Sequence, residues 1–151
     1  MVEKRSNHIF DAAYGNERVI AWLFLPKTAA RPYQVVVFFL SIIAFSEREI
    51  GGAEFKYADF LIKSGRALMY PVYKGRYERR SAAVAVPGSI ADRDLTIQQY
   101  MDFERSLDYL DTRSGIAHDR LGYYGVSQGG WIGPIALAEP ESRRPCCGVG
   151  D

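Results

Sequence analysis

The sequence has two cysteines, two histidines and no long uninterrupted hydrophobic segment. The cysteines, Cys146 and Cys147, are adjacent, so they provide neither a disulfide framework nor a multi-ligand metal site. The longest apolar stretch, residues 35–45, contains Ser41 and reaches about half the length of a membrane-crossing helix. The N-terminal residues lack the apolar core of a secretory signal. These absences favour a protein of the reducing cytoplasm with no metal and no membrane contact.

An excess of charge of one sign is also missing. There are 19 Lys and Arg against 18 Asp and Glu, a net charge of +1. Such a balance does not supply the broad basic surface of a nucleic-acid-binding protein, so we expect no nucleic-acid partner. Hydrophobic residues make up 48% and charged residues 25%, which is ordinary for a globular protein and excludes a disordered or collagen-like chain. The 151 residues fit one domain or part of one.

The hydrophobic pattern predicts alternating strands and helices. We expect strands at residues 18–25, 33–40, 66–73 and 121–126, and helices of about ten residues from 53, at 94–111 and from 128 onward. This succession favours an α/β fold with a mostly parallel sheet and helices on both faces. Gly65 sits where a glycine would end the first helix.

Two segments fall outside the pattern. Residues 74–91 are interpreted as a surface loop whose basic side chains are solvated, with a carboxylate-binding patch as the alternative. Those side chains are Lys74, Arg76, Arg79 and Arg80. Residues 143–151 show no periodicity and are predicted to be an irregular tail. The expected organisation is therefore one domain at residues 1–142 followed by the tail.

One motif carries chemistry. Gly125, Val126, Ser127, Gln128 and Gly129 form G-x-S-x-G, with Gly130 next, between a predicted strand and a predicted helix. Ser127 would sit on a sharp turn with its hydroxyl exposed, and the glycines would remove the clashes that such a turn creates. The following helix would direct the backbone N–H of Gln128 at a developing oxyanion. A structural turn without chemistry is the alternative. The strand–turn–helix context favours a nucleophile.

Residues 118–130, HDRLGYYGVSQGG, resemble the nucleophile region of α/β-hydrolases of the prolyl oligopeptidase and dienelactone hydrolase type. The segments ERVIAWLFLPK and PYQVVVFF are similar to the opening strands of that family. The resemblance implies an α/β-hydrolase fold and a serine hydrolase, an esterase or peptidase-like acyl hydrolase, without a cofactor. Its substrate would be a small-molecule ester or a peptide, and Ser127 would form the acyl-enzyme. A second oxyanion donor is expected in the loop at Leu40 and Ser41.

The remaining triad members are not found. In α/β-hydrolases an acid and then a histidine follow the serine, and no histidine follows Ser127. His118 precedes Ser127 by nine residues, up to roughly 30 Å along a strand, and nothing in the sequence positions His8. Glu139 would lie about 18 Å along the same helix, and Asp151 belongs to the tail. We therefore expect a truncated hydrolase domain that lacks its C-terminal strands and is nearly inactive.

A second function class stays open: a hydrolase-fold remnant that acts as a non-catalytic interaction module. With later strands absent, the strand at residues 121–126 would present an exposed apolar edge. We expect self-association, or pairing with another chain, through that edge.

Overall fold

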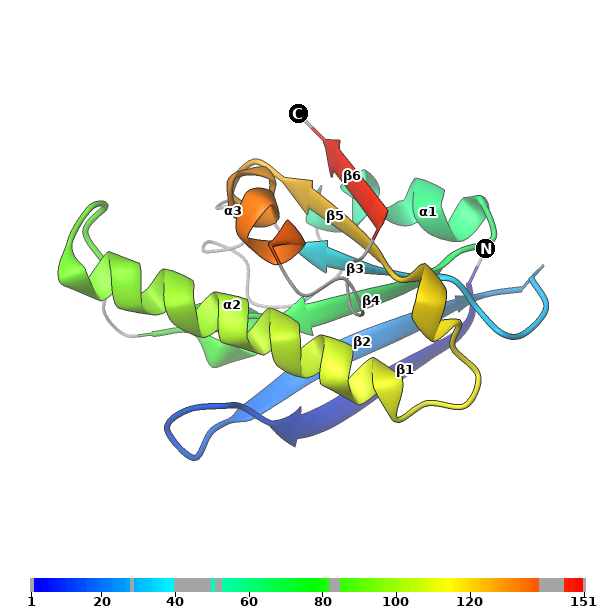
Figure 1. Ribbon diagram of the computed structural model, residues 1–151, viewed down its shortest axis with the longest axis horizontal. Coiled ribbons are helices and arrows are strands. Elements are labelled where there is room, and N and C mark those ends of the chain that lie inside the picture. Colours follow the sequence, from blue (N-terminus) through cyan, green and yellow to red (C-terminus); the bar gives the residue numbers. More distant parts are fainter. Residues whose placement is uncertain are drawn as a thin grey trace.

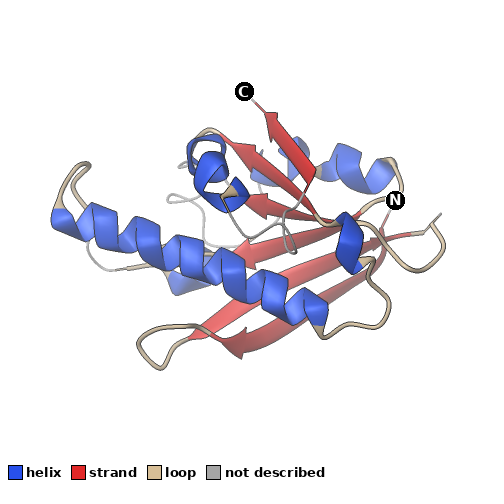
Figure 2. Ribbon diagram, in the orientation of Figure 1, coloured by secondary structure: helices blue, strands red, loops and turns tan. Residues whose placement is uncertain are grey.

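A computed structural model describes residues 2–27, 29–39, 50, 53–81, 85–138 and 146–150. Its strands are β1 (Val2–Asp11), β2 (Arg18–Pro26), β3 (Val35–Phe39), β4 (Ala67–Val72), β5 (Gly122–Val126) and β6 (Cys146–Gly150). Its α-helices are α1 (Asp59–Lys63), α2 (Ile90–Asp111) and α3 (Gln128–Leu137), and short 3-10 helices lie at Ala53–Tyr57, Tyr77–Arg79 and His118–Arg120. The strands form one sheet in the order β1-β2-β4-β3-β5-β6 (Figures 1 and 2).

The sheet is parallel from β4 through β3 and β5 to β6, and antiparallel from β1 through β2 to β4. The predicted α/β class with a mostly parallel sheet is confirmed, and four predicted strands correspond to β2, β3, β4 and β5. β4 continues through Pro71, which lies opposite Ala21 of β2, and ends at Val72. All five residues of β3 are buried, as their apolar sequence predicts for a central strand.

Helices lie on both faces of the sheet. Neighbouring residues of a strand point to opposite faces, so the ring contacts of Tyr123 and Tyr124 in β5 identify the helices on each side. Tyr123 makes an edge-on contact with Phe103 of α2, whereas Tyr124 makes one with Phe60 of α1. The Tyr123 hydroxyl also donates to the carbonyl oxygen of Gly129, which places α3 on the α2 side. Figure 1 shows α2 and α3 together on the near side.

Capping residues explain where two of the helices begin and end. α2 starts at Ile90, earlier than predicted, because the Ser89 hydroxyl accepts a hydrogen bond of 3.2 Å from the backbone N–H of Asp92 and caps the helix. The first predicted helix is divided into a 3-10 turn and α1, followed by Gly65 with φ +87°. Within the described part of the chain, no helix has both the length and the apolar character needed to cross a membrane.

Both ends of the described chain differ from expectation. β1 was not predicted, because its residues alternate with polar and charged side chains and resemble a loop. Residues 143–151 were predicted to be irregular, but Cys146–Gly150 form β6 and pair in parallel with β5. The predicted exposed edge of β5 was therefore wrong, since β6 covers it. The backbone groups of β5 require partners, and a short segment of small residues can supply them whatever its periodicity. Self-association stays a prediction.

Candidate active site

Ser127 occupies the turn that joins β5 to α3. Its backbone has φ +54° and ψ −108°, a region that side-chain-bearing residues rarely adopt, and its side chain is exposed. Such a conformation costs of order 1–3 kcal/mol and persists only where the surroundings impose it. The turn therefore holds the Ser127 hydroxyl out at the end of the parallel strands where their carboxyl ends meet.

Two glycines allow the close packing that imposes this turn. A Cβ atom on Gly125 would lie 2.4 Å from the carbonyl carbon and oxygen of Gly129. A Cβ atom on Gly129 would lie 2.1 Å from the carbonyl oxygen of Phe39, the last residue of β3. The backbone N of Gly130 is the next atom that a Gly125 Cβ would meet, at 2.8 Å. Only glycine at positions 125 and 129 lets β3, β5 and α3 converge below Ser127.

The first turn of α3 points its free backbone donors toward Ser127. The backbone N–H of Trp131 donates to the carbonyl oxygen of Ser127 at 3.1 Å, which closes the first helical turn. The N–H groups before it, starting with Gln128, have no acceptor within the helix. This end of the helix also carries partial positive charge. The second predicted donors, Leu40 and Ser41, lie outside the described residues.

The side chain of Gln128 is held by a buried arginine. Arg76, 1% exposed, donates through its guanidinium to the Gln128 side-chain oxygen. On its other side the Gln128 amide donates to Gln99 of α2 at 3.5 Å, and Gln99 donates to the carbonyl oxygen of Lys74 at 2.8 Å. The residue that follows Ser127 is thereby tied to α2 and to the loop after β4.

Asp102 of α2 anchors the same loop from within the protein. Its side chain is fully buried and accepts hydrogen bonds from the Tyr14 hydroxyl, from the backbone N–H of Lys74, both at 2.8 Å, and from the Arg79 guanidinium at 2.5 Å. Burial raises the pKa of Asp102, whereas Arg79 and the other donors act in the opposite direction. Burial and the charge of Asp102 raise the pKa of Tyr14, so its hydroxyl keeps its proton and donates.

The interpretation of residues 74–80 as a solvated loop was wrong for two arginines. Arg76 is buried, and the Arg79 side chain is only 7% exposed. The sequence contained a usable signal. β4 and β5 both run parallel to β3, so residues that follow β4 must emerge at the same edge of the sheet as Ser127. Basic side chains immediately after a buried strand at that edge are placed to contact the site.

The chain is similar to known proteins in structure but not detectably in sequence. No protein-family model and no curated protein matches the chain. An acetyl xylan esterase from Paenibacillus sp. R4 matches with a TM-score of 0.64 and 24% identity, over 93% of this chain and 46% of that one. An esterase from Pyrococcus furiosus matches with a TM-score of 0.67 and 13% identity, over 95% and 47%. An acylaminoacyl peptidase from Pyrococcus horikoshii gives 0.61 and 15%, over 92% and 22%.

The chain has the α/β-hydrolase fold. It spans less than half of each of these three solved chains, and at these identities the likeness concerns the fold alone. The turn that carries Ser127 is the position at which this fold places a nucleophile when it has one.

Neither histidine of the chain lies beside Ser127. His8 is in β1, where its Nδ1 lies 2.7 Å from the Tyr109 hydroxyl and its Nε2 lies 2.7 Å from the Ser6 hydroxyl. β1 is separated from β5 by β2, β4 and β3, about 19 Å at the usual strand spacing. His118 lies before the opposite end of β5 and pairs with Asp111 at 3.4 Å. Glu139 and Asp151 lie outside the described residues.

The described residues around the turn were also considered as ligands for a metal ion. Among the residues whose positions are described, no group of three His, Cys, Asp or Glu side chains is arranged to hold a metal ion. What the described residues bring to this edge is a hydroxyl, a helix N-terminus and the polar contacts that fix Gln128.

Proposed function

We propose that these residues form the nucleophile-bearing part of a serine hydrolase that cleaves ester or peptide bonds through an acyl-enzyme at Ser127. The observation that carries the proposal is the exposed Ser127 at positive φ in the turn between β5 and α3. Solved proteins of the same fold that are named esterases and an acylaminoacyl peptidase support the reaction class. A small-molecule ester is the first substrate to test, because ester cleavage demands the least specialised pocket.

In this reaction the Ser127 Oγ attacks the substrate carbonyl carbon, and a general base takes the hydroxyl proton. The carbonyl oxygen becomes negative and accepts from the backbone N–H of Gln128, with the second donor proposed at Leu40 and Ser41. The intermediate collapses, and the leaving alcohol or amine departs with a proton. Water then attacks the acyl-enzyme, releasing the acid and restoring the serine.

The 151 residues supply no histidine that can act as this base, so we expect slow acylation. A fluorophosphonate probe tests the nucleophile directly, since attack by a serine Oγ on phosphorus expels fluoride and leaves a stable adduct. We expect a slow adduct that peptide mass spectrometry maps to Ser127. Ser127→Ala should abolish it, whereas Ser114→Ala, a change at another exposed serine, should not. Labelling that persists in Ser127→Ala would contradict the proposal.

The second candidate function is a non-catalytic interaction module with the hydrolase fold. It is favoured by the positions of His8, at the far side of the sheet, and His118, at the far end of β5. In that case the probe leaves Ser127 unmodified even after prolonged exposure. A binding partner, once found, would be retained with unchanged affinity by Ser127→Ala. We place either form of the protein in the reducing cytoplasm, on its low cysteine content.

A further inference from the structure

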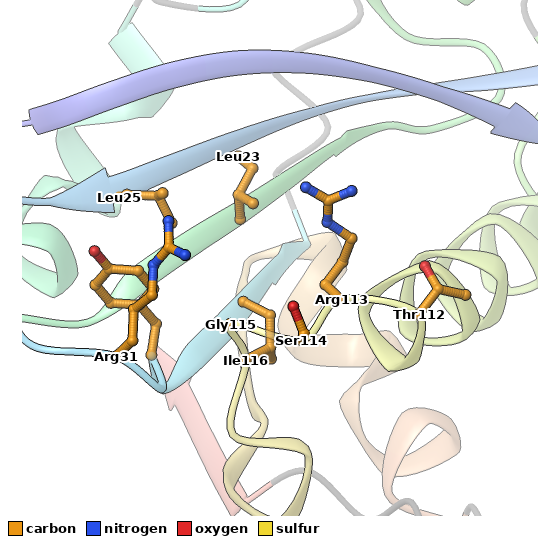
Figure 3. Close-up of a pocket in the computed structure, with 9 residues that line it drawn as sticks. Leu23, Leu25, Arg31, Thr112, Arg113, Ser114, Gly115 and Ile116 are labelled. Atoms are coloured by element: carbon orange, nitrogen blue, oxygen red, sulfur yellow. The ribbon is translucent and has the colours of Figure 1, made fainter.

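A concave site lies at the opposite end of the parallel strands from Ser127. It is a cavity of about 230 Å³ between the end of β2, the segment before β3 and the segment after α2 (Figure 3). Tyr33, which lines it, precedes β3, whereas Phe39 at the other end of β3 lies below the Ser127 turn. Phe39 is six positions beyond Tyr33, which is roughly 20 Å along an extended chain. The cavity is therefore no part of the site at Ser127.

The wall of this cavity is fixed by backbone hydrogen bonds. The N–H of Tyr33 donates to the carbonyl oxygen of Gly115 at 2.9 Å, and the N–H of Ala117 donates to the carbonyl oxygen of Tyr33 at 2.9 Å. Arg31 packs over Gly115, where a Cβ would lie 3.6 Å from the arginine Cδ. The two segments that supply most of the lining are thus joined before any ligand arrives.

The lining combines an apolar base with two cations. Leu23, Tyr33 and Ile116 are buried, with 5%, 8% and 5% exposure. Arg31 and Arg113 are exposed. In Figure 3 Leu23 lies between them, and both guanidinium groups point toward the part of the cavity that Leu23 lines. Across the described ranges, neither guanidinium forms a recorded ion pair with a carboxylate.

The acids nearest in sequence are engaged elsewhere. Asp108 pairs with Arg105 at 2.8 Å, and a carboxylate oxygen of Asp111 lies 3.4 Å from Nδ1 of His118. The C-terminal end of α2 faces this region and carries about half a negative charge, which two full guanidinium charges outweigh. The cavity therefore presents net positive charge beside apolar surface.

We propose that this cavity binds a small molecule with an oxyanion head group, carboxylate or phosphate, on a short apolar body. Arg31 and Arg113 would donate to the head group, since planar guanidinium forks match carboxylate and phosphate oxygens. Leu23 and Ile116 would contact the apolar body. A cavity of about 230 Å³ suits a body of a few carbons. The proposal is independent of the reaction at Ser127.

Calorimetric titration of the full chain with hexanoate, hexyl phosphate and hexanol tests the proposal. We expect saturable binding of at least one anion, and binding of hexanol at least about tenfold weaker. The anion that binds more tightly identifies the head group. Arg31→Gln and Arg113→Gln should each weaken anion binding by about tenfold or more. Raising the salt concentration should weaken it further.

Arg93→Gln provides the matched control, because Arg93 is an exposed arginine paired with Asp94 and the change removes the same charge. It should leave anion affinity unchanged. Far-UV circular dichroism of each variant checks that the fold is retained. The proposal is overturned if neither anion binds, if hexanol binds as well as both anions, or if Arg93→Gln weakens binding as much as the two cavity variants.

Discussion

Replacing Asp102 by Asn tests whether the buried ion pair fixes the loop after β4. The Asp102 side chain is 0% exposed and that of Arg79 is 7% exposed, so the substitution leaves a buried guanidinium without its main counter-charge. Removing one partner of such a pair costs about 3–5 kcal/mol. A carboxylate oxygen of Glu17 lies 3.5 Å from the Arg79 guanidinium and still offsets part of its positive charge. We therefore expect a cost at the lower end of this range. Asn can also still accept from Tyr14.

We therefore expect Asp102→Asn to lower the free energy of unfolding by about 3 kcal/mol. For a chain of this length that corresponds to a fall in Tm of about 6–12 °C. Urea unfolding followed by far-UV circular dichroism measures the first quantity, and a thermal scan measures the second. Since net stabilities are about 5–15 kcal/mol, the variant should still fold in dilute buffer.

Asp94→Asn is the matched control, because Asp94 pairs with Arg93 at 2.6 Å but both side chains are more than half exposed. It should cost about 0–1 kcal/mol. The double variant Asp102→Asn/Arg79→Met should lose less free energy of unfolding than the sum of the two single variants, because it no longer contains an unpaired buried charge. Equal urea midpoints for Asp102→Asn and Asp94→Asn would refute the reasoning.

Two further predictions concern the glycine packing below Ser127 and the ion pair of Glu17. Gly129→Ala would bring a Cβ to within 2.1 Å of the Phe39 carbonyl oxygen and should cost at least about 3 kcal/mol in urea unfolding. Gly88→Ala, with open space around its Cβ but φ +79°, should cost about 1 kcal/mol, and equal costs would contradict the packing argument. The hydrogen bond from Lys74 lowers the pKa of Glu17 in the folded protein. The contribution of ionised Glu17 to the free energy of unfolding is therefore fully present above the ordinary pKa of 4.5 and is lost as the pH falls through the lowered pKa of the folded state. The stability difference between the wild type and Glu17→Gln should therefore shrink below about pH 4.5, and a difference that is constant with pH would exclude this role.

The sequence predicts a strand or helix well where the buried and exposed side chains of the segment follow a clear pattern. β3 is buried on both faces, and its continuous apolar run identified it. β1 pairs on one side only and alternates with polar residues, so its pattern could not be distinguished from that of a loop. The G-x-S-x-G spacing predicted the turn at Ser127, because the glycines that avoid steric clashes in this turn lie within two residues of the serine.

The residues that fix the turn could not be found in this way, since their partners are distant in sequence. Asp102 is hydrogen-bonded to Tyr14, 88 positions away in the sequence, and to Arg79, 23 positions away. Arg76 is hydrogen-bonded to Gln128, 52 positions away. Charged residues are mostly exposed, so a cluster of arginines favours a solvated loop until the sheet order is known. Topology supplies the missing information by bringing the ends of β4 and β5 to one edge.

This arrangement links the stability of the domain to the geometry at Ser127. In the proposed reaction Gln128 must keep its backbone N–H directed at the oxyanion, and its side chain is held by Arg76 from the loop after β4. That loop is in turn fixed to α2 through Asp102 and Gln99. A change at Asp102 should therefore slow fluorophosphonate labelling of Ser127 even in conditions where the variant is fully folded. Unchanged labelling would mean that the glycine packing below Ser127 is sufficient to hold the turn.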